Sequence, residues 1–347
     1  MNYNLQNERM VIPMRQVAAG ALALLLALFL LPLLLVPQGE GALPVESGSL
    51  PIDRTVVTPE PALDSAQQVK VKLADGTVET MALDNYLWGV VAAEMPAAFE
   101  TEALKAQATA ARTYTYSKME RSTAAHPEAD LCTDVNCCQA YRTREDAAAS
   151  WGESAQLYTD KIAAAVADTD GMAVLYNGSP IQAVFFSSAD GRTVDAVEVW
   201  GNSVPYLTGV DSPEGEEVPN YHSTVTLTAE EFKTAFLAKY PGADLSGDPA
   251  GWFANTVSNS AGGVSSVDVG GVTVSGQDLR TLFSLRSTSF TVSAGAEGVT
   301  FSVTGYGHGV GMSQYGANAL AKEGKSYEEI LKWYYTGVEV EQYTPGQ

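Results

Sequence analysis

The longest hydrophobic run in the chain lies near its start. Residues Val17–Val36 carry no charged side chain, and the run has about the ~20 residues that a membrane-spanning helix needs. Arg9 and Arg15 precede it, so the positive-inside rule predicts a cytoplasmic N-terminus and an exported remainder. A cleaved signal peptide is the alternative, because Gln38–Ala42 offers small residues, although the run exceeds the usual apolar region of such peptides.

The pattern after this run predicts a tether and then alternating hairpins and helices. Residues 38–67 are rich in Pro, Gly and acidic residues, which indicates a tether. Alternation around Asp75-Gly76 predicts a hairpin over 69–81, and the Asn177-Gly178 turn predicts a second one over 172–187. Helical periodicity predicts helices near 84–95, 101–115 and 158–167.

The rest of the chain is mostly strand and loop up to residue 304, with one helix near 230–239, and then ends in two helices at 313–322 and 327–335. Helices at both ends and strands in the middle predict an α+β fold rather than a doubly wound sheet. The predicted parts are a cytoplasmic N-terminus and anchor at 1–37, a tether at 38–67, a helical region at 68–165, a strand-rich middle domain at 166–304, and a Gly-rich loop with helices at 305–347.

Charge restricts the partners. The formal net charge is −21, from 20 Lys and Arg against 41 Asp and Glu. Nucleic acid is disfavoured as a partner because phosphate backbones are bound by a surplus of cations. Anionic wall polymers and lipids are disfavoured for the same reason. The expected substrate is neutral, or is met by a local basic group.

The three cysteines lie within seven positions of one another, at 132, 137 and 138. His126 precedes them, and thiolate with imidazole is the preferred ligand set for zinc. The spacing lacks a C-x2-C pattern, so a disulfide from Cys132 to Cys137 or Cys138 is an equal alternative.

Glu94 is a lone carboxylate within an apolar stretch that ends at Pro96. Burial there would raise its pKa, as a general acid requires, although a surface role is the commoner fate of a glutamate. Glycines alternate from Gly305 to Gly311 around His308, and they match no dinucleotide fingerprint. This segment suits either a sugar-binding wall or a tight structural turn.

Four segments together resemble the stage II sporulation protein D family. They are residues 86–96, which contain Glu94, residues 102–114, residues 138–141, and residues 307–317 with the sequence Gly-His-Gly-Val-Gly-Met-Ser-Gln-Tyr-Gly-Ala. The resemblance implies a lytic transglycosylase that cleaves peptidoglycan glycan strands during engulfment in sporulation. Glu94 would be its catalytic acid and base, which explains why only one carboxylate stands out where ordinary glycosidases use two.

The resemblance also implies a metal site, partners and a location. His126, Cys132 and Cys138 match zinc ligands of family members, whereas Cys137 does not, and the zinc is expected to be structural. The expected partners are the amidase stage II sporulation protein P and the membrane protein stage II sporulation protein M, in the mother-cell membrane facing the forespore. Residues expected to bind glycan are Arg112, Tyr141, Ser187, His308, Gly309, Ser313, Gln314 and Tyr315.

Two other functions remain open from the sequence. A non-enzymatic, glycan-binding scaffold that activates a partner amidase would need the same wall-facing surface without a catalytic Glu94. A zinc-dependent wall hydrolase would use His126, Cys132 and Cys138 around a catalytic metal, although this chain has only three histidines.

Overall fold

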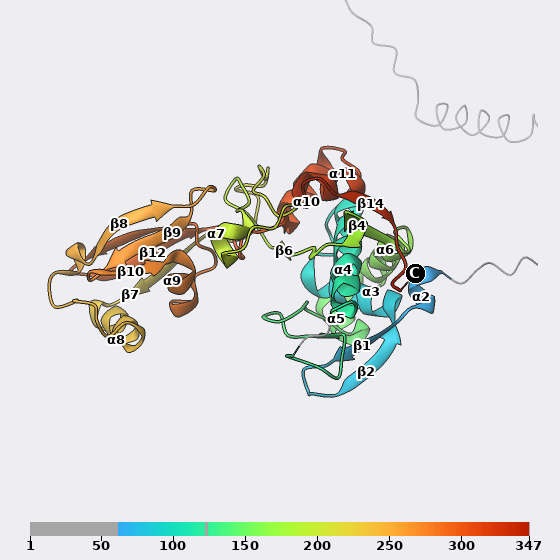
Figure 1. Ribbon diagram of the computed structural model, residues 1–347, viewed down its shortest axis with the longest axis horizontal. Coiled ribbons are helices and arrows are strands. Elements are labelled where there is room, and N and C mark those ends of the chain that lie inside the picture. Colours follow the sequence, from blue (N-terminus) through green and yellow to red (C-terminus); the bar gives the residue numbers. More distant parts are fainter. Residues whose placement is uncertain (1–61, 122–123, 347) are drawn as a thin grey trace, which may run out of the picture. The chain divides into compact units, whose positions relative to one another are not determined.

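The computed structural model describes residues 62–121 and 124–346, and these form an α+β protein, as predicted. Figure 1 shows the arrangement of its elements. In chain order they are α2 (Leu63–Ala66), β1 (Gln68–Lys72), β2 (Val78–Ala82), α3 (Leu83–Glu94), α4 (Thr101–Met119), β3 (Leu131–Cys132), α5 (Arg144–Trp151), η1 (Gly152–Ser154), α6 (Ala155–Ala167), β4 (Met172–Tyr176), β5 (Ser179–Pro180), β6 (Phe185–Phe186), α7 (Ala196–Trp200), β7 (His222–Leu227), α8 (Ala229–Lys239), η2 (Pro249–Gly251), β8 (Phe253–Ser258), β9 (Val264–Val269), β10 (Val272–Ser275), α9 (Gly276–Leu282), β11 (Phe290–Gly295), β12 (Gly298–Thr304), β13 (Met312–Ser313), α10 (Gln314–Lys322), α11 (Tyr327–Tyr334) and β14 (Glu339–Gln342).

The predicted membrane anchor and nearly all of the predicted tether lie outside the described residues. Within the described ranges, no helix is both long and apolar enough to cross a bilayer.

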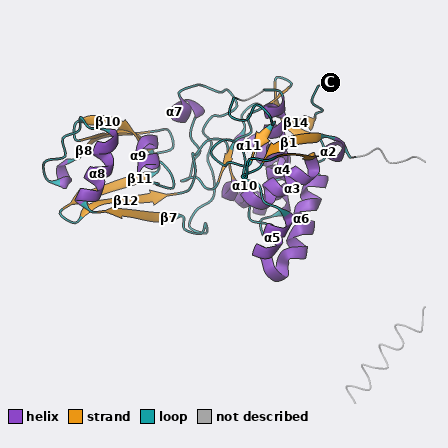
Figure 2. Ribbon diagram, turned by 90° about the horizontal axis from the view of Figure 1, so that it is seen from below, coloured by secondary structure: helices purple, strands orange, loops and turns teal. Residues whose placement is uncertain are grey.

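Helix α4 occupies the centre of a first hydrophobic core. It contacts α3, α6, α10, α11 and strand β4, and Figures 1 and 2 show α3, α4 and α6 side by side. The helix is buried nearly all round because small side chains let its neighbours approach closely. The fully buried alanines on it are Ala103, Ala106, Ala108, Ala110 and Ala111.

The first predicted hairpin is confirmed. Strands β1 and β2 pair antiparallel, with Gln68 opposite Ala82 and Lys72 opposite Val78. Strand β1 also pairs in parallel with the two-residue strand β3, which places Cys132 beside Lys72. The cysteine-bearing loop is therefore attached to the edge of the hairpin sheet.

The second predicted hairpin is only partly correct. Asn177 and Gly178 both have positive φ, at 51° and 78°, which is the geometry of a type I′ turn. Strand β4 pairs with β5 across this turn, but the predicted strand over 181–187 is wrong. Instead, Phe185–Phe186 forms β6 and pairs in parallel with β13, so a strand distant in sequence replaces the local partner.

A second hydrophobic core lies among strands β7 to β12. These strands form two antiparallel sheets, ordered β10-β9-β8 and β11-β12-β7, against which α8 and α9 pack. Phe232 of α8 stacks on Phe283 with ring centres 4.8 Å apart and contacts Phe301 of β12. Residues 172–210, grouped with the strand-rich region in the sequence analysis, contribute instead to the first core.

Helix α5 was not predicted. Thr143 caps it by accepting a hydrogen bond from the Asp146 backbone N–H, and Trp151 at its end packs edge-on against Trp88 of α3. Its only fully buried residue is Ala147, so a strong apolar periodicity is absent from its sequence.

Candidate active site and metal centre

Glu94 is the last residue of α3. Met95 after it is extended, with φ −122° and ψ 136°, and its N–H closes the last turn on Val91. The residue before a proline is biased away from helical conformation, so Pro96 ends the helix here. The Glu94 side chain is partly buried, between the helix end and the loop that follows the cysteines.

One backbone donor holds the Glu94 carboxyl. The backbone N–H of Ala140 donates to Glu94 Oε1 at 2.7 Å. Burial raises the pKa of Glu94, whereas the Ala140 N–H and the Gln314 side chain lower it, and burial is the larger effect. Because an amide N–H can only donate, Oε1 accepts this bond, which makes Oε2 the favoured position for the proton of the neutral form.

Helices α4 and α10 supply the rest of this environment. Gln314, the first residue of α10, donates through Nε2 to Oε1 of Gln107 at 3.4 Å. Gln107 is fully buried on α4, and its Nε2 has no hydrogen-bond partner among the described residues. Sequence reasoning missed Gln107, although an amide on the alanine-rich face of α4 was a usable signal.

The Ser313 hydroxyl makes hydrogen bonds within the fold. It caps α10 by accepting a hydrogen bond from the Gly316 N–H at 3.2 Å. Its hydroxyl also donates to Glu214, which is buried and accepts further hydrogen bonds from the Ala189 N–H and the Ser212 hydroxyl. Glu214 thus ties the start of α10 to the 187–191 loop. It too was missed, because nothing in its surrounding sequence marks it.

Two tyrosines follow residues of this site directly in the chain: Tyr141 follows Ala140, and Tyr315 follows Gln314. The Tyr315 ring packs edge-on against Phe99, with ring centres 4.9 Å apart. Tyr141 follows the Ala140 contact and stacks on Tyr86 at 5.9 Å. Both tyrosines are partly exposed, so each keeps surface that a sugar ring could use.

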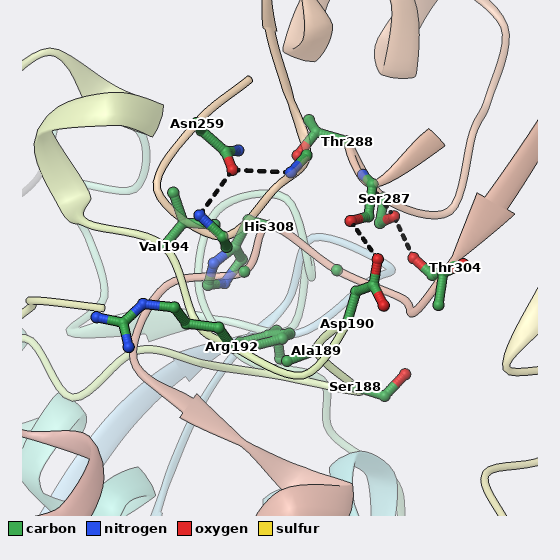
Figure 3. A pocket seen from close by; sticks show the side chains of 16 residues that line it. Ser188, Ala189, Asp190, Arg192, Val194, Asn259, Ser287, Thr288, Thr304 and His308 are labelled. Atoms are coloured by element: carbon green, nitrogen blue, oxygen red, sulfur yellow. Dashed lines mark hydrogen bonds between the residues drawn. The ribbon is translucent and has the colours of Figure 1, made fainter. Parts of the chain in front are cut away.

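His308 lies in a separate pocket, shown in Figure 3. Its Nδ1 accepts from the Val310 N–H and its Nε2 meets the Phe185 carbonyl oxygen, both at 3.1 Å, which fixes the proton on Nε2. Burial first, and then the Arg280 charge, lowers the pKa of His308 to about 4. Gly309 lines the same pocket with a φ of 81°. Within the described part of the chain, no hydrogen bond joins His308 or Gly309 to Glu94.

Ser187 and Arg112 differ in what they expose. Ser187 is partly exposed, and its carbonyl oxygen accepts from the Tyr315 N–H. Arg112 has no exposed surface: its guanidinium pairs with Asp64 at 2.6 Å and also donates to Thr169. The side chain predicted to bind glycan is therefore inside the first core, where it holds α2 in place.

His126, Cys132, Cys137 and Cys138 converge on one point. Their ligand atoms all lie within 4.8 Å of one another. His126 Nε2 is 3.3 Å from Cys138 Sγ, and the sulfurs of Cys137 and Cys138 are 3.9 Å apart. The Nδ1 of His126 lies 3.0 Å from the Ala129 carbonyl oxygen, which keeps the proton there and leaves the Nε2 lone pair facing the thiols.

These distances suit a tetrahedral ion. Bond lengths of ~2.3 Å to sulfur and ~2.0 Å to nitrogen imply ligand–ligand edges of roughly 3.5–3.8 Å. The separations of 3.3 Å and 3.9 Å are close to these edges, and no pair of ligand atoms is more than 4.8 Å apart. The predicted triad of His126, Cys132 and Cys138 is thus brought together, and Cys137 joins it as a fourth candidate ligand. All three cysteines are free thiols, so the alternative disulfide is not formed.

The fold and site define an α+β protein with one partly buried carboxyl and a thiol–imidazole cluster joined to it by a short loop. A family model described as Stage II sporulation protein matches residues 74–176. The chain is 38% identical over 336 residues to stage II sporulation protein D of Bacillus subtilis (strain 168), covering 93% of this chain and 95% of that protein. It is 37% identical over 284 residues to the protein of the same name from Bacillus amyloliquefaciens, covering 81% of each.

A further relative is the amidase enhancer of Bacillus subtilis (strain 168). It is 32% identical over 308 residues, covering 74% of this chain and 40% of that protein. The chain belongs to the stage II sporulation protein D family, as its sequence resemblance predicts.

Proposed function

We propose that this protein is a lytic transglycosylase that cleaves peptidoglycan glycan strands during engulfment in sporulation. The observation that carries the proposal is the Glu94 carboxyl, held by the Ala140 N–H in surroundings that raise its pKa. In the described part of the chain, no other carboxylate hydrogen-bonds to Ala140, which holds Glu94, or to the side chains of Gln314 and Gln107. Lytic cleavage needs one such group, whereas hydrolysis generally uses two.

The proposed reaction has two proton transfers through Glu94. In the first, the proton on Oε2 passes to the glycosidic oxygen of the bond after muramic acid, the C1–O bond breaks, and its electron pair stays on the leaving oxygen. In the second, the resulting carboxylate takes the proton of the 6-hydroxyl while that oxygen bonds to C1. The product is a 1,6-anhydro ring. Because the nucleophile belongs to the same sugar, proximity replaces a bound water.

We further propose that His126, Cys132, Cys137 and Cys138 hold a structural zinc ion. Zinc would supply a rigid crosslink rather than a reacting group, since four protein ligands leave no open position. Cys138 precedes Ala140 by two residues, and Ala140 donates to Glu94. The cluster would therefore fix the loop that positions the catalytic carboxyl.

The expected setting also belongs to this proposal. We infer an anchor at 17–36 in the mother-cell membrane, with the described region outside, and association with the amidase stage II sporulation protein P and with stage II sporulation protein M. An amidase partner would strip stem peptides and leave a glycan with little charge beyond its lactyl groups. That substrate suits a chain of net charge −21.

A second candidate function is amidase activation. The observation that favours it is the relative named amidase enhancer. Incubating the purified chain with peptide-free glycan strands, without any amidase, separates the two functions. Cleaved strands support the transglycosylase. Intact strands, together with a faster amidase on whole peptidoglycan, would support activation instead.

A further inference from the structure

Arg286 is an arginine without an acidic partner. Arg112 and Arg192 each pair with an aspartate, at 2.6 and 2.7 Å, whereas Arg286 makes no ion pair among residues 62–121 and 124–346. Its Nε is buried and has no hydrogen-bond partner. Among the buried side-chain atoms of the described ranges that lack a partner, Arg286 Nε is the one that belongs to a charged side chain. A buried donor left unpaired costs free energy, so the absence of any acidic partner for this arginine within the described residues calls for an explanation.

The guanidinium is held in a defined place. It lies over the Tyr306 ring, with Cζ 4.1 Å from the ring centre, and 45% of the Tyr306 surface is exposed. The Arg286 backbone is fixed as well, because its carbonyl oxygen accepts from the Gly307 N–H at 2.9 Å and from Arg280 Nε at 3.3 Å. An arginine stacked on a ring keeps its planar edge free for two parallel hydrogen bonds to a carboxylate.

Backbone hydrogen bonds connect this stack to the Glu94 site. Tyr306 exchanges both backbone hydrogen bonds with Ser188. The neighbouring Ser187 accepts from the Tyr315 N–H at 3.0 Å, and Tyr315 follows Gln314, whose side chain lowers the pKa of the Glu94 carboxyl. The adjacent residues Ser187 and Ser188 thus bond to two different tyrosines, Tyr315 and Tyr306. The positive charge of Arg286 also lowers the pKa of Tyr315, an effect smaller than that of burial, which raises it.

We propose that Arg286, stacked on Tyr306, binds the lactyl carboxylate of a muramic acid residue in the glycan held at Glu94. This assignment rests on the proposed function for its substrate class. It gives an acidic protein a local cation that an acidic sugar can pair with, and it makes Arg286 a specificity-determining residue rather than a catalytic one. Glycans without the carboxylate would lose this contact and nothing else.

Binding measurements test the assignment without turnover. The full chain carrying Glu94→Gln is titrated by calorimetry with a peptide-free glycan tetrasaccharide, and with the same glycan whose lactyl groups are capped as methylamides. Adding Arg286→Gln should weaken binding of the acidic glycan by about tenfold or more, as expected for a charge-assisted pair, and leave binding of the capped glycan unchanged. Arg121→Gln, which removes an exposed charge elsewhere, serves as the control.

Three outcomes would overturn the assignment. Equal weakening on both glycans would show that Arg286 only supports the fold. Unchanged binding of the acidic glycan would show that there is no contact, and so would a wild-type chain without preference between the two glycans.

A second variant covers the case in which Arg286→Gln does not fold. Arg286→Lys retains the charge but loses the two parallel N–H donors of the guanidinium, and it should show a smaller selective loss. If the chain with Glu94 intact binds the acidic glycan selectively but does not cleave it, the proposed transglycosylase activity is contradicted and the Arg286 binding site is still supported.

Discussion

The backbone N–H of Ala140 donates a 2.7 Å hydrogen bond to Oε1 of Glu94. Ala140 lies two residues after Cys138, whose sulfur faces His126 Nε2. The candidate metal cluster and the candidate acid are therefore joined by one short segment of chain. Metal occupancy and the position of the carboxyl should vary together, even though the proposed reaction does not use the metal.

Replacing Cys137 tests the cluster directly. Cys137→Ser should lower zinc affinity by more than the roughly 10–100-fold typical of losing an outer-shell partner, because it removes a ligand. Zinc content by mass spectrometry and competition with a chromophoric chelator give the affinity. Asp134→Asn is the matched control, since Asp134 lies in the same loop but outside the cluster and should keep wild-type affinity. Wild-type affinity in Cys137→Ser would restrict the ligand set to the other three residues.

Removing zinc should also reduce glycan cleavage, through the Ala140 contact. The loss should be partial and should be reversed by Zn²⁺ or by a redox-inert tetrahedral substitute. A complete loss that only Zn²⁺ restores would instead support a catalytic metal and the metallohydrolase reading.

Replacing Glu94 should lower activity and raise the free energy of unfolding at neutral pH. Glu94→Gln should abolish cleavage, by at least about 100-fold. Burial raises the folded-state pKa of Glu94, so the folded state binds more protons than the unfolded state above the ordinary pKa. The wild-type free energy of unfolding should then fall as pH rises through the interval up to the raised pKa. Glu94→Gln should match wild type below that interval and be more stable above it. Urea titrations from pH 4 to 8 measure this; a variant less stable than wild type at neutral pH would contradict it.

Arg112 should be a stability residue. Arg112→Met leaves Asp64 buried without its partner, and breaking such a pair costs about 3–5 kcal/mol. Adding Asp64→Asn should recover a large part of that loss in a double-mutant cycle of unfolding free energies. Glycan affinity of the folded fraction should stay at the wild-type value. A stable Arg112→Met protein with weakened glycan binding would return Arg112 to the substrate-binding set.

Gly316 should tolerate no side chain. It lies in α10, where alanine would normally gain about 1 kcal/mol over glycine. A Cβ there would lie 2.5 Å from a Glu214 carboxylate oxygen and nearer still to the Tyr334 and Ser212 hydroxyls. Overpacking costs about 1–3 kcal/mol, so we expect net destabilisation of Gly316→Ala in thermal unfolding. Gly242→Ala, whose Cβ would meet no atom within 4 Å, should be neutral.

Local chemistry made part of this structure predictable. The Asn177-Gly178 turn, the 69–81 hairpin and the helix that ends before Pro96 depend on residues close in sequence, and they appear where expected. The strand over 181–187 failed because its partner, β13, lies more than a hundred residues away. Helix α5 carries too few apolar residues for a periodic signal.

The candidate site divides in the same way. Glu94 stood out as a carboxylate in an apolar stretch, and the cysteines stood out by clustering. Arg112 was misplaced because its partner, Asp64, lies 48 residues earlier, in a segment that looked like tether. Glu214 and Arg286 could not be found, because their importance comes from contacts with α10 and Tyr306 that no local pattern encodes.

The most direct test of the central claim is cleavage of peptide-free glycan in water enriched with oxygen-18, with wild type and Glu94→Gln run in parallel. The account predicts wild-type products with 1,6-anhydro-muramyl ends that carry no oxygen-18, and no new ends from Glu94→Gln. Reducing ends labelled with oxygen-18 would show attack by water and contradict a lytic reaction, and unimpaired cleavage by Glu94→Gln would contradict the role of Glu94.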